Sequence, residues 1–166
     1  MRVLFVTTEM DDFVRVGGLA AVSAALPRAL RPWSDVRIML PGYRDVVEQF
    51  THIEIVGQCA ALAEMPAAEL GRASTKDGLP VYVLLCPQLY DRPGNPYGDE
   101  AGRDWGDNDI RFGRFASAAE SRGSARNGAT GPRDVHRFAS GDHWQTLIRS
   151  TLIRNTKDTK QGISQE

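Results

Sequence analysis

The sequence of 166 residues predicts an α/β fold with a parallel sheet at its centre. A buried-strand pattern, a glycine turn, an amphipathic helix and a second strand follow one another at the start of the chain. A third, strongly apolar strand follows at residues 80–85. Strands joined through a helix in this way form βαβ units, which have right-handed crossovers and bind ligands at the carboxyl ends of their strands.

The first strand and the helix after it frame a candidate anion-binding loop. An apolar run at residues 3–6 predicts the strand, and Gly17 and Gly18 stand at the start of the helix. Glycines let backbone N–H groups approach an anion at a helix end that carries partial positive charge, and Arg15 adds a cation. We expect the helix to bury one apolar stripe, made of Leu19, Val22, Ala25, Leu26 and Leu30.

The middle of the chain predicts more strands and a second helix. Residues 35–40 form the second strand of the βαβ unit and end at a Pro-Gly turn. Alternating residues at 53–56 and a segment at 69–74 precede a turn at 76–78 and the core strand at 80–85. A long turn-rich loop follows, and residues 107–109 offer N-cap chemistry for a helix that carries Ile110, Phe112, Phe115 and Ala119.

The composition changes near residue 120, and this change predicts the domain boundaries. Residues 1–119 carry 12 Lys and Arg against 16 Asp and Glu, whereas residues 120–166 carry 8 against 5. The second segment is rich in Ser, Gly, Arg and Asn, a composition that buries too little apolar surface to order itself. We therefore predict a domain at 1–119 and a disordered tail at 120–166, in which only residues 144–153 have an apolar rhythm, enough for a marginal helix.

Composition also narrows the classes of function. The net charge of −1 gives no reason to expect nucleic acid or an anionic membrane as a partner. No signal pattern or long apolar run is present, so we expect a cytoplasmic protein. Cys59 and Cys86 are expected to be free thiols. We predict no metal site, because the spacing of the histidines suits neither metal binding nor acid–base work: His52, His136 and His143.

Three motifs, in order, resemble the family of bacterial glycogen synthases and plant starch synthases. The first spans residues 1–30 together with the strand and turn at 36–43. The second is the Tyr-Asp-Arg-Pro-Gly-Asn-Pro-Tyr run at 90–97. The third combines Asp107 and Asn108 with Arg111 and Phe112. Three motifs in order over residues 1 to about 119 identify the chain as a member of this family, and the tail takes no part in the resemblance.

The resemblance implies a fold and a reaction. Members of the family are retaining glucosyltransferases that move glucose from ADP-glucose to the non-reducing end of an α-1,4-glucan, without a metal or another cofactor. Their fold is of the GT-B type, with two facing Rossmann-like domains. This chain is similar to about half of the N-terminal domain and lacks the later acidic, histidine and Arg/Lys motifs, so we expect a truncated and inactive form, with ADP-glucose and the glucan as partners by resemblance.

The resemblance implies substrate contacts for individual residues, and the sequence departs from the family motif at two positions. Arg15 stands where the family has the lysine of its glycine motif, and Gly17 and Gly18 match that motif, so these three residues are candidates for binding the phosphates of ADP-glucose. Arginine binds phosphate as a planar fork and lysine as a point charge, so the exchange is not neutral. Ala21 replaces the usual aspartate, which puts a sugar contact in doubt. Tyr97 and Asn108 are candidate cleft residues with local structure as the alternative, Arg111 is interpreted as structural, and no catalytic residue is assigned.

Three hypotheses stay open from the sequence. The chain is a glycogen synthase product cut short by a frameshift near residue 120, or a stable non-catalytic module that binds glucan or an anion. A third hypothesis, an unrelated Rossmann-type nucleotide-binding protein, is disfavoured by the second and third motifs. In the first case we expect self-association through an uncovered sheet face or edge, lined by Leu4, Val6, Val36, Ile38, Val83 and Leu85.

Overall fold

The computed structural model describes residues 1–123 and 144–148, with side chains described for residues 1–120. The predicted strands of the first 90 residues and the two helices predicted within residues 1–119 are confirmed, with small shifts at their ends. The elements in chain order are β1 (Arg2–Val6), α1 (Gly18–Leu30), β2 (Asp35–Pro41), α2 (Arg44–Val47), β3 (Glu54–Cys59), β4 (Ala68–Ser74), β5 (Pro80–Leu85), α3 (Pro87–Tyr90), α4 (Asn108–Gly123) and β6 (Trp144–Ile148).

The strands form one mixed sheet of six strands in the order β3-β4-β5-β2-β1-β6. The pairs β5–β2, β2–β1 and β1–β6 are parallel, whereas β3–β4 and β4–β5 are antiparallel. The turn between β4 and β5 includes Gly78 at φ 76°, a backbone angle that favours glycine. The predicted α/β class, the parallel βαβ unit and the hairpin before β5 are therefore confirmed.

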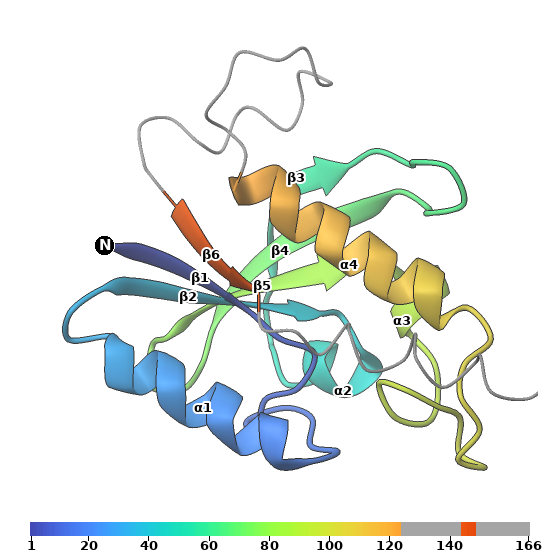
Figure 1. Cartoon of the computed structure of the whole chain (residues 1–166), viewed down its shortest axis with the longest axis horizontal. Helices are drawn as coiled ribbons and strands as arrows, with labels where there is room; N and C mark the ends of the chain where they lie inside the picture. Colours follow the sequence, from blue (N-terminus) through green and yellow to red (C-terminus); the bar gives the residue numbers. More distant parts are fainter. Residues whose placement is uncertain (124–143, 149–166) are drawn as a thin grey trace, which may run out of the picture.

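Two helices flank the central strands (Figure 1). The connection from β1 to β2 moves one way along the sheet, and the connection from β5 to β6 moves the other way. Because such crossovers are right-handed, α1 and α4 lie on opposite faces of the sheet. The carboxyl ends of β1, β2 and β5 meet at one edge, and the loops that follow these strands gather there (Figure 1).

The buried face of α1 differs from the predicted one. Ala20 and Ser23 are 0% exposed and Pro27 is also buried, whereas Val22 and Leu26 are each 38% exposed. The predicted apolar stripe is therefore wrong for Val22, Ala25 and Leu26, which are exposed, whereas Leu19 and Leu30 are partly buried and Leu30 packs against the core. Small residues face the sheet because the helix approaches it closely enough for the Ser23 hydroxyl to lie 2.9 Å from the Thr7 hydroxyl.

The region after residue 119 is corrected in two places. Helix α4 continues to Gly123, and the marginal helix expected at 144–153 is wrong, because residues 144–148 form β6. β6 pairs in parallel with β1, whose free edge offers backbone hydrogen-bond partners, and Trp, Thr and Ile favour strands. Residues 124–143 and 149–166 lie outside the described residues, so disorder there, and the boundary between 119 and 120, stay predictions.

The central sheet is covered on both faces. Five of the six residues that we expected to line an uncovered face are at most 8% exposed: Leu4, Val6, Val36, Ile38 and Val83. The expectation is wrong for these five, because both faces of the central strands are covered. Leu85 alone is partly exposed, and self-association stays a prediction. No helix in the described part of the chain combines the length and apolar character that crossing a bilayer requires.

Candidate functional site

The loop from β1 to α1 is compact and anchored at its base. Thr7 N donates to Met39 O at 3.0 Å, which continues the parallel pairing of β1 with β2. Met10 is fully buried and exchanges backbone hydrogen bonds with Val14, so the loop closes on itself before it reaches the glycines. The loop therefore holds a defined shape at the carboxyl edge of the sheet, where α/β folds bind ligands.

The Glu9 carboxylate organises this loop. Glu9 is 3% exposed, and its Oε2 accepts hydrogen bonds from Val16 N at 3.0 Å and Gly17 N at 2.9 Å. The Thr7 hydroxyl donates to Glu9 O at 2.9 Å and steadies the backbone below the carboxylate. A negative side chain near the N-terminus of α1 is favourable to the helix dipole. Two amides of the glycine loop therefore have their acceptor within the protein.

The two glycines face open space. A Cβ atom added at Gly17 or Gly18 would meet no heavy atom within 4 Å. Gly17 is the N-cap of α1 with extended backbone, and no side chain caps the helix. Neither packing nor backbone angle within the described residues requires glycine at residue 17, so the backbone there is open to close approach by a ligand.

The start of α1 leaves amides for a ligand. Among the described residues, nothing accepts a hydrogen bond from the backbone N–H of Gly18 or Leu19, whereas Ala20 N donates to Gly17 O at 3.3 Å. The first turn of α1 holds no acidic residue. Unpaired N–H groups at a helix N-terminus form a ready anion site.

Arg15 is exposed and pairs with an acidic residue of the same loop. Its side chain is 71% exposed, and its Nε lies 3.5 Å from Asp11 Oδ1. The next acidic residue, Asp12, pairs instead with Arg28 on α1 at 2.7 Å, and Arg28 also holds Asp77. The loop thus carries two neighbouring carboxylates with different partners, of which only Asp11 engages the candidate phosphate-binding cation.

Tyr97 brings the second motif to the glycine loop. Its hydroxyl donates to Glu9 Oε1 at 2.5 Å and lies 3.0 Å from the Thr8 hydroxyl. Burial, with the hydrogen bond to Glu9 as the next cause, raises the pKa of Tyr97 well above its usual range. The phenol is therefore neutral and serves as a hydrogen-bond donor to the carboxylate.

Asn108 supports Tyr97 from the start of α4. Its Nδ2 donates to Tyr97 O at 2.8 Å, and its Oδ1 accepts from Arg111 Nη1 at 2.7 Å. Arg111 is 1% exposed and also donates to Leu89 O and Pro96 O at 2.9 Å each, which agrees with its structural interpretation. Burial lowers the pKa of this guanidinium.

The structure therefore joins three of the five predicted site residues through one that the sequence analysis missed. Asn108 bonds Tyr97, Tyr97 bonds Glu9, and Glu9 bonds Gly17. Gly18 follows at the helix start, whereas Arg15 stands outside this chain of hydrogen bonds. The position of Glu9, three residues after a buried strand and before a loop with unpaired amides, is the signal that could have pointed to it.

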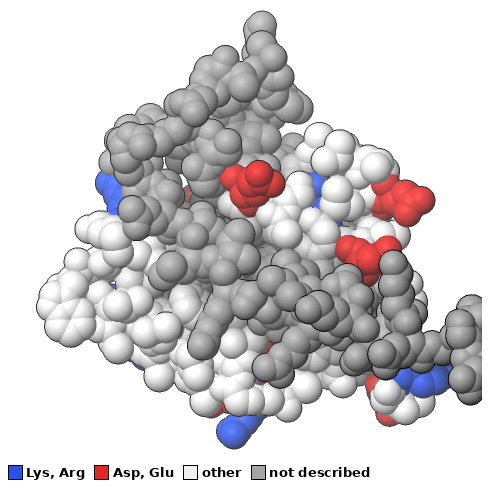
Figure 2. Space-filling model, viewed as in Figure 1, with Lys and Arg blue, Asp and Glu red and all other residues white. Residues whose placement is uncertain are grey.

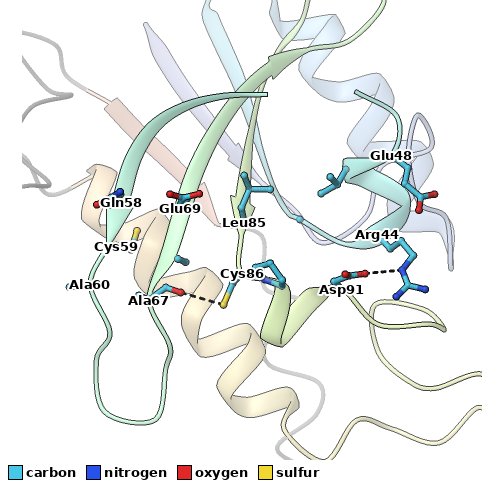
Figure 3. Close-up of a pocket in the computed structure, with 14 residues that line it drawn as sticks. Arg44, Glu48, Gln58, Cys59, Ala60, Ala67, Glu69, Leu85, Cys86 and Asp91 are labelled. Carbon is cyan, nitrogen blue, oxygen red and sulfur yellow. Dashed lines mark hydrogen bonds and ion pairs between the residues drawn. The ribbon is translucent and has the colours of Figure 1, made fainter. Parts of the chain in front are cut away.

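A groove lies along the same edge of the sheet, away from the glycine loop (Figure 3). It has a cavity volume of about 820 Å³, and an ion pair between Arg44 Nε and Asp91 Oδ1 at 2.8 Å stands at its side. None of the predicted site residues lines it. The residues around it are Gly42, Arg44, Val47, Glu48, Gln58, Cys59, Ala60, Ala67, Ala68, Glu69, Leu85, Cys86, Pro87 and Asp91.

On the face shown in Figure 2, the visible charged side chains of the described residues form small separate groups of both signs. Within residues 1–120, whose side chains are described, no three His, Cys, Asp or Glu groups lie together as metal ligands would.

A mostly parallel sheet whose first strand leads through a glycine loop into a helix defines a Rossmann-like domain. Within that class, residues 2–161 match the model of the starch synthase catalytic domain. The chain belongs to this family. The three motifs described in the sequence analysis all lie before residue 119. The match to the family model continues past that residue, to residue 161.

Curated relatives agree with the family. Glycogen synthase 1 of Bradyrhizobium diazoefficiens is 81% identical over 110 residues, which cover 66% of this chain and 24% of the relative. Glycogen synthase of Pseudomonas putida is 43% identical over 170 residues, which cover 98% of this chain and 33% of the relative. The chain therefore spans about a quarter to a third of the length of these relatives.

A solved structure supports the GT-B type of fold. The catalytic domain of Starch Synthase IV from Arabidopsis thaliana, bound to ADP and acarbose, matches with a TM-score of 0.50 and 27% identity. The match covers 72% of this chain and 24% of that domain. The predicted relationship to the N-terminal portion of a two-domain glycosyltransferase is thereby confirmed.

Proposed function

We propose that this chain supplies part of the active site of a glucosyltransferase that moves glucose from ADP-glucose to the non-reducing end of an α-1,4-glucan. The observation that carries the proposal is the loop from β1 to α1. Its glycines face open space, and two amides at the helix end have no acceptor among the described residues. In a member of the starch synthase family, such a loop suits the diphosphate of the donor.

Arg15, Gly17 and Gly18 bind the phosphates of the donor in this proposal. Gly18 contributes its N–H group, whereas Gly17 contributes close approach, since its own N–H is held by Glu9. An exposed ion pair such as that of Arg15 with Asp11 is worth about 0.2–1 kcal/mol, so a diphosphate displaces Asp11 at little cost. A cation beside the leaving diphosphate then stabilises charge that develops in the transition state.

Tyr97 and Asn108 form the sugar side of the site. The Tyr97 hydroxyl is engaged by Glu9 and Thr8, so its half-buried ring is the part that a sugar contacts. Asn108 has both ends of its amide engaged and acts through Tyr97. The ADP and acarbose bound to the Arabidopsis domain support these two ligand classes, a nucleotide and a glucan-like sugar.

Titration of the purified chain with ADP-glucose tests this assignment. We expect saturable binding that Arg15→Gln weakens about three- to tenfold, because one charged contact to phosphate is lost. Arg72→Gln is the matched control, since Arg72 pairs with Glu54 at the far side of the sheet. Equal binding by Arg15→Gln and the unaltered chain, or no binding at all, would contradict the assignment.

The same loop would serve a non-catalytic module that binds an anion or a glucan. Binding alone does not separate this alternative from the enzyme. Glucose transfer does, because only a site that takes part in catalysis affects the rate of transfer.

A further inference from the structure

Two amides in exposed residues of the glycine loop are held by a buried carboxylate. Val16 is 47% exposed and Gly17 is also exposed, yet the N–H groups of both donate to Oε2 of Glu9, a residue that is 3% exposed. Exposed loop amides otherwise bond to water. A fixed acceptor at this point therefore sets the direction of the loop just before α1 begins.

The second oxygen of the same carboxylate is fixed from a distant part of the chain. Tyr97 lies 88 positions after Glu9 and donates its hydroxyl to Oε1, and the Thr8 hydroxyl lies beside that phenol. Both oxygens are thus occupied, so the carboxylate keeps one orientation. Charge-assisted hydrogen bonds of this kind are about twice as strong as neutral ones.

We propose that Glu9, oriented by Tyr97, is the positioning residue of the glycine loop. Its carboxylate holds the amides of Val16 and Gly17 and leaves those of Gly18 and Leu19 to meet an anionic ligand. The part of this inference that concerns the ligand rests on the proposed function, whereas the part that concerns the loop does not.

The negative charge of Glu9 affects where an anion can bind along the loop. A phosphate placed against the amide of Gly17 would approach the Glu9 carboxylate, and two like charges at contact distance repel each other. The first free amides beyond that point are those of Gly18 and Leu19, at the positive end of α1. Glu9 therefore decides where along the loop an anion binds.

Amide hydrogen exchange, measured by NMR on the full chain without ligand, tests the positioning. We expect the amides of Val16 and Gly17 to be protected although the two residues are exposed. Glu9→Ala should speed their exchange about tenfold or more, because their charged acceptor is lost. Glu9→Gln keeps one oxygen acceptor and should restore part of the protection, and the isosteric Tyr97→Phe should give an intermediate loss.

Ser23→Ala is the matched control. It removes the hydrogen bond between Thr7 and Ser23 in the same region and leaves Glu9 intact. Loss of protection at Val16 and Gly17 in the Tyr97→Phe variant but not in this control supports the proposal. Unprotected amides in the unaltered chain, or equal loss in both variants, overturn it.

Titration with inorganic pyrophosphate, followed through the same amide signals, tests the ligand part. We expect the signals of Gly18 and Leu19 to move and those of Val16 and Gly17 to stay. Larger shifts at Val16 and Gly17 overturn the inference while leaving the proposed anion site in place. If pyrophosphate moves none of the four, the ligand part and the proposed function both fail, and the exchange pattern alone decides whether Glu9 positions the loop.

Discussion

The guanidinium of Arg15 lies 3.5 Å from the Asp11 carboxylate, so an acidic residue of the loop occupies the cation that we assign to the donor phosphates. Asp12, the next residue, is turned toward Arg28. The affinity of the loop for an anion therefore depends on a competition within the protein.

Removing the competitor should strengthen anion binding. We expect Asp11→Asn to raise the affinity of the chain for pyrophosphate about threefold, because an exposed ion pair is weak and the repulsion between Asp11 and the ligand also disappears. The gain should shrink as salt is added, since exposed charges are screened. Asp12→Asn is the control and should leave the affinity unchanged; calorimetric titrations in which both variants gain equally would contradict this prediction.

Replacement of Gly18 and of Gly42 by alanine should have different effects on the free energy of unfolding. At Gly18 an added Cβ meets nothing within 4 Å, so we expect Gly18→Ala to keep the free energy of unfolding or raise it by up to about 1 kcal/mol while anion binding weakens. At Gly42 the Cβ would lie 2.9 Å from Leu84 O, so Gly42→Ala should destabilise the chain. Urea denaturation and pyrophosphate titration measure the two effects. A destabilised Gly18→Ala variant would mean that residue 18 serves folding.

Replacing the buried cation Arg111 should lower the free energy of unfolding more than replacing the exposed cation Arg72. We expect Arg111→Lys to lower the free energy of unfolding by about 2 kcal/mol or more, because lysine cannot reach the three oxygens that the buried guanidinium bonds. Arg72→Lys should change it by less than about 1 kcal/mol, since Arg72 forms an exposed pair with Glu54. Equal urea midpoints for the two variants would count against the structural role of Arg111.

Acid should weaken the contact between α1 and the β4–β5 hairpin. The hydrogen bond from Arg28, followed by that from Thr75, lowers the pKa of Asp77 well below its usual value of 3.8. A carboxyl group whose pKa is lower in the folded state stabilises the fold above its unfolded pKa, and this contribution is lost as pH falls below about 4. Melting temperatures should be measured between pH 2.5 and 6. We expect the melting temperature of Asp77→Asn to fall less steeply with decreasing pH than that of the unaltered chain.

Asp104→Asn serves as the control for this pH dependence, because the Asp104 carboxylate is exposed and bonds no other described residue. We expect its melting midpoint to decline with acid as in the unaltered chain. The same slope in all three proteins would show that Asp77 contributes nothing to the pH dependence of stability.

The sequence was sufficient for elements whose signal is local. Val3, Phe5 and the run from Pro80 to Leu85 have strand patterns, and Gly78 marks the hairpin turn, so β1, β4 and β5 could be predicted. Two features depend on tertiary context instead. The buried face of α1 is set by the close approach of Ser23 to Thr7, and β6 forms because β1 has a free edge.

The candidate site shows the same limit. Gly17 and Gly18 were found from their place between a strand and a helix, and Tyr97 and Asn108 from a family motif. Glu9 was missed because its role comes from contacts with residues 8 and 88 positions away, and its place shortly after a buried strand was the local signal of that role. The partner of Arg15 was missed for a different reason: the loop offers two adjacent carboxylates, and only the fold selects Asp11.

The most direct test of the proposed function is glucose transfer by a chimera. The 110-residue segment that this chain shares with Bradyrhizobium diazoefficiens glycogen synthase 1 replaces its counterpart in that enzyme, and incorporation of labelled glucose from ADP-glucose into glycogen is measured. We predict transfer by the chimera, a loss of about tenfold or more in its Arg15→Gln version, and no transfer by the isolated chain of 166 residues. A folded chimera that binds pyrophosphate but transfers no glucose would contradict the account and favour the non-catalytic module.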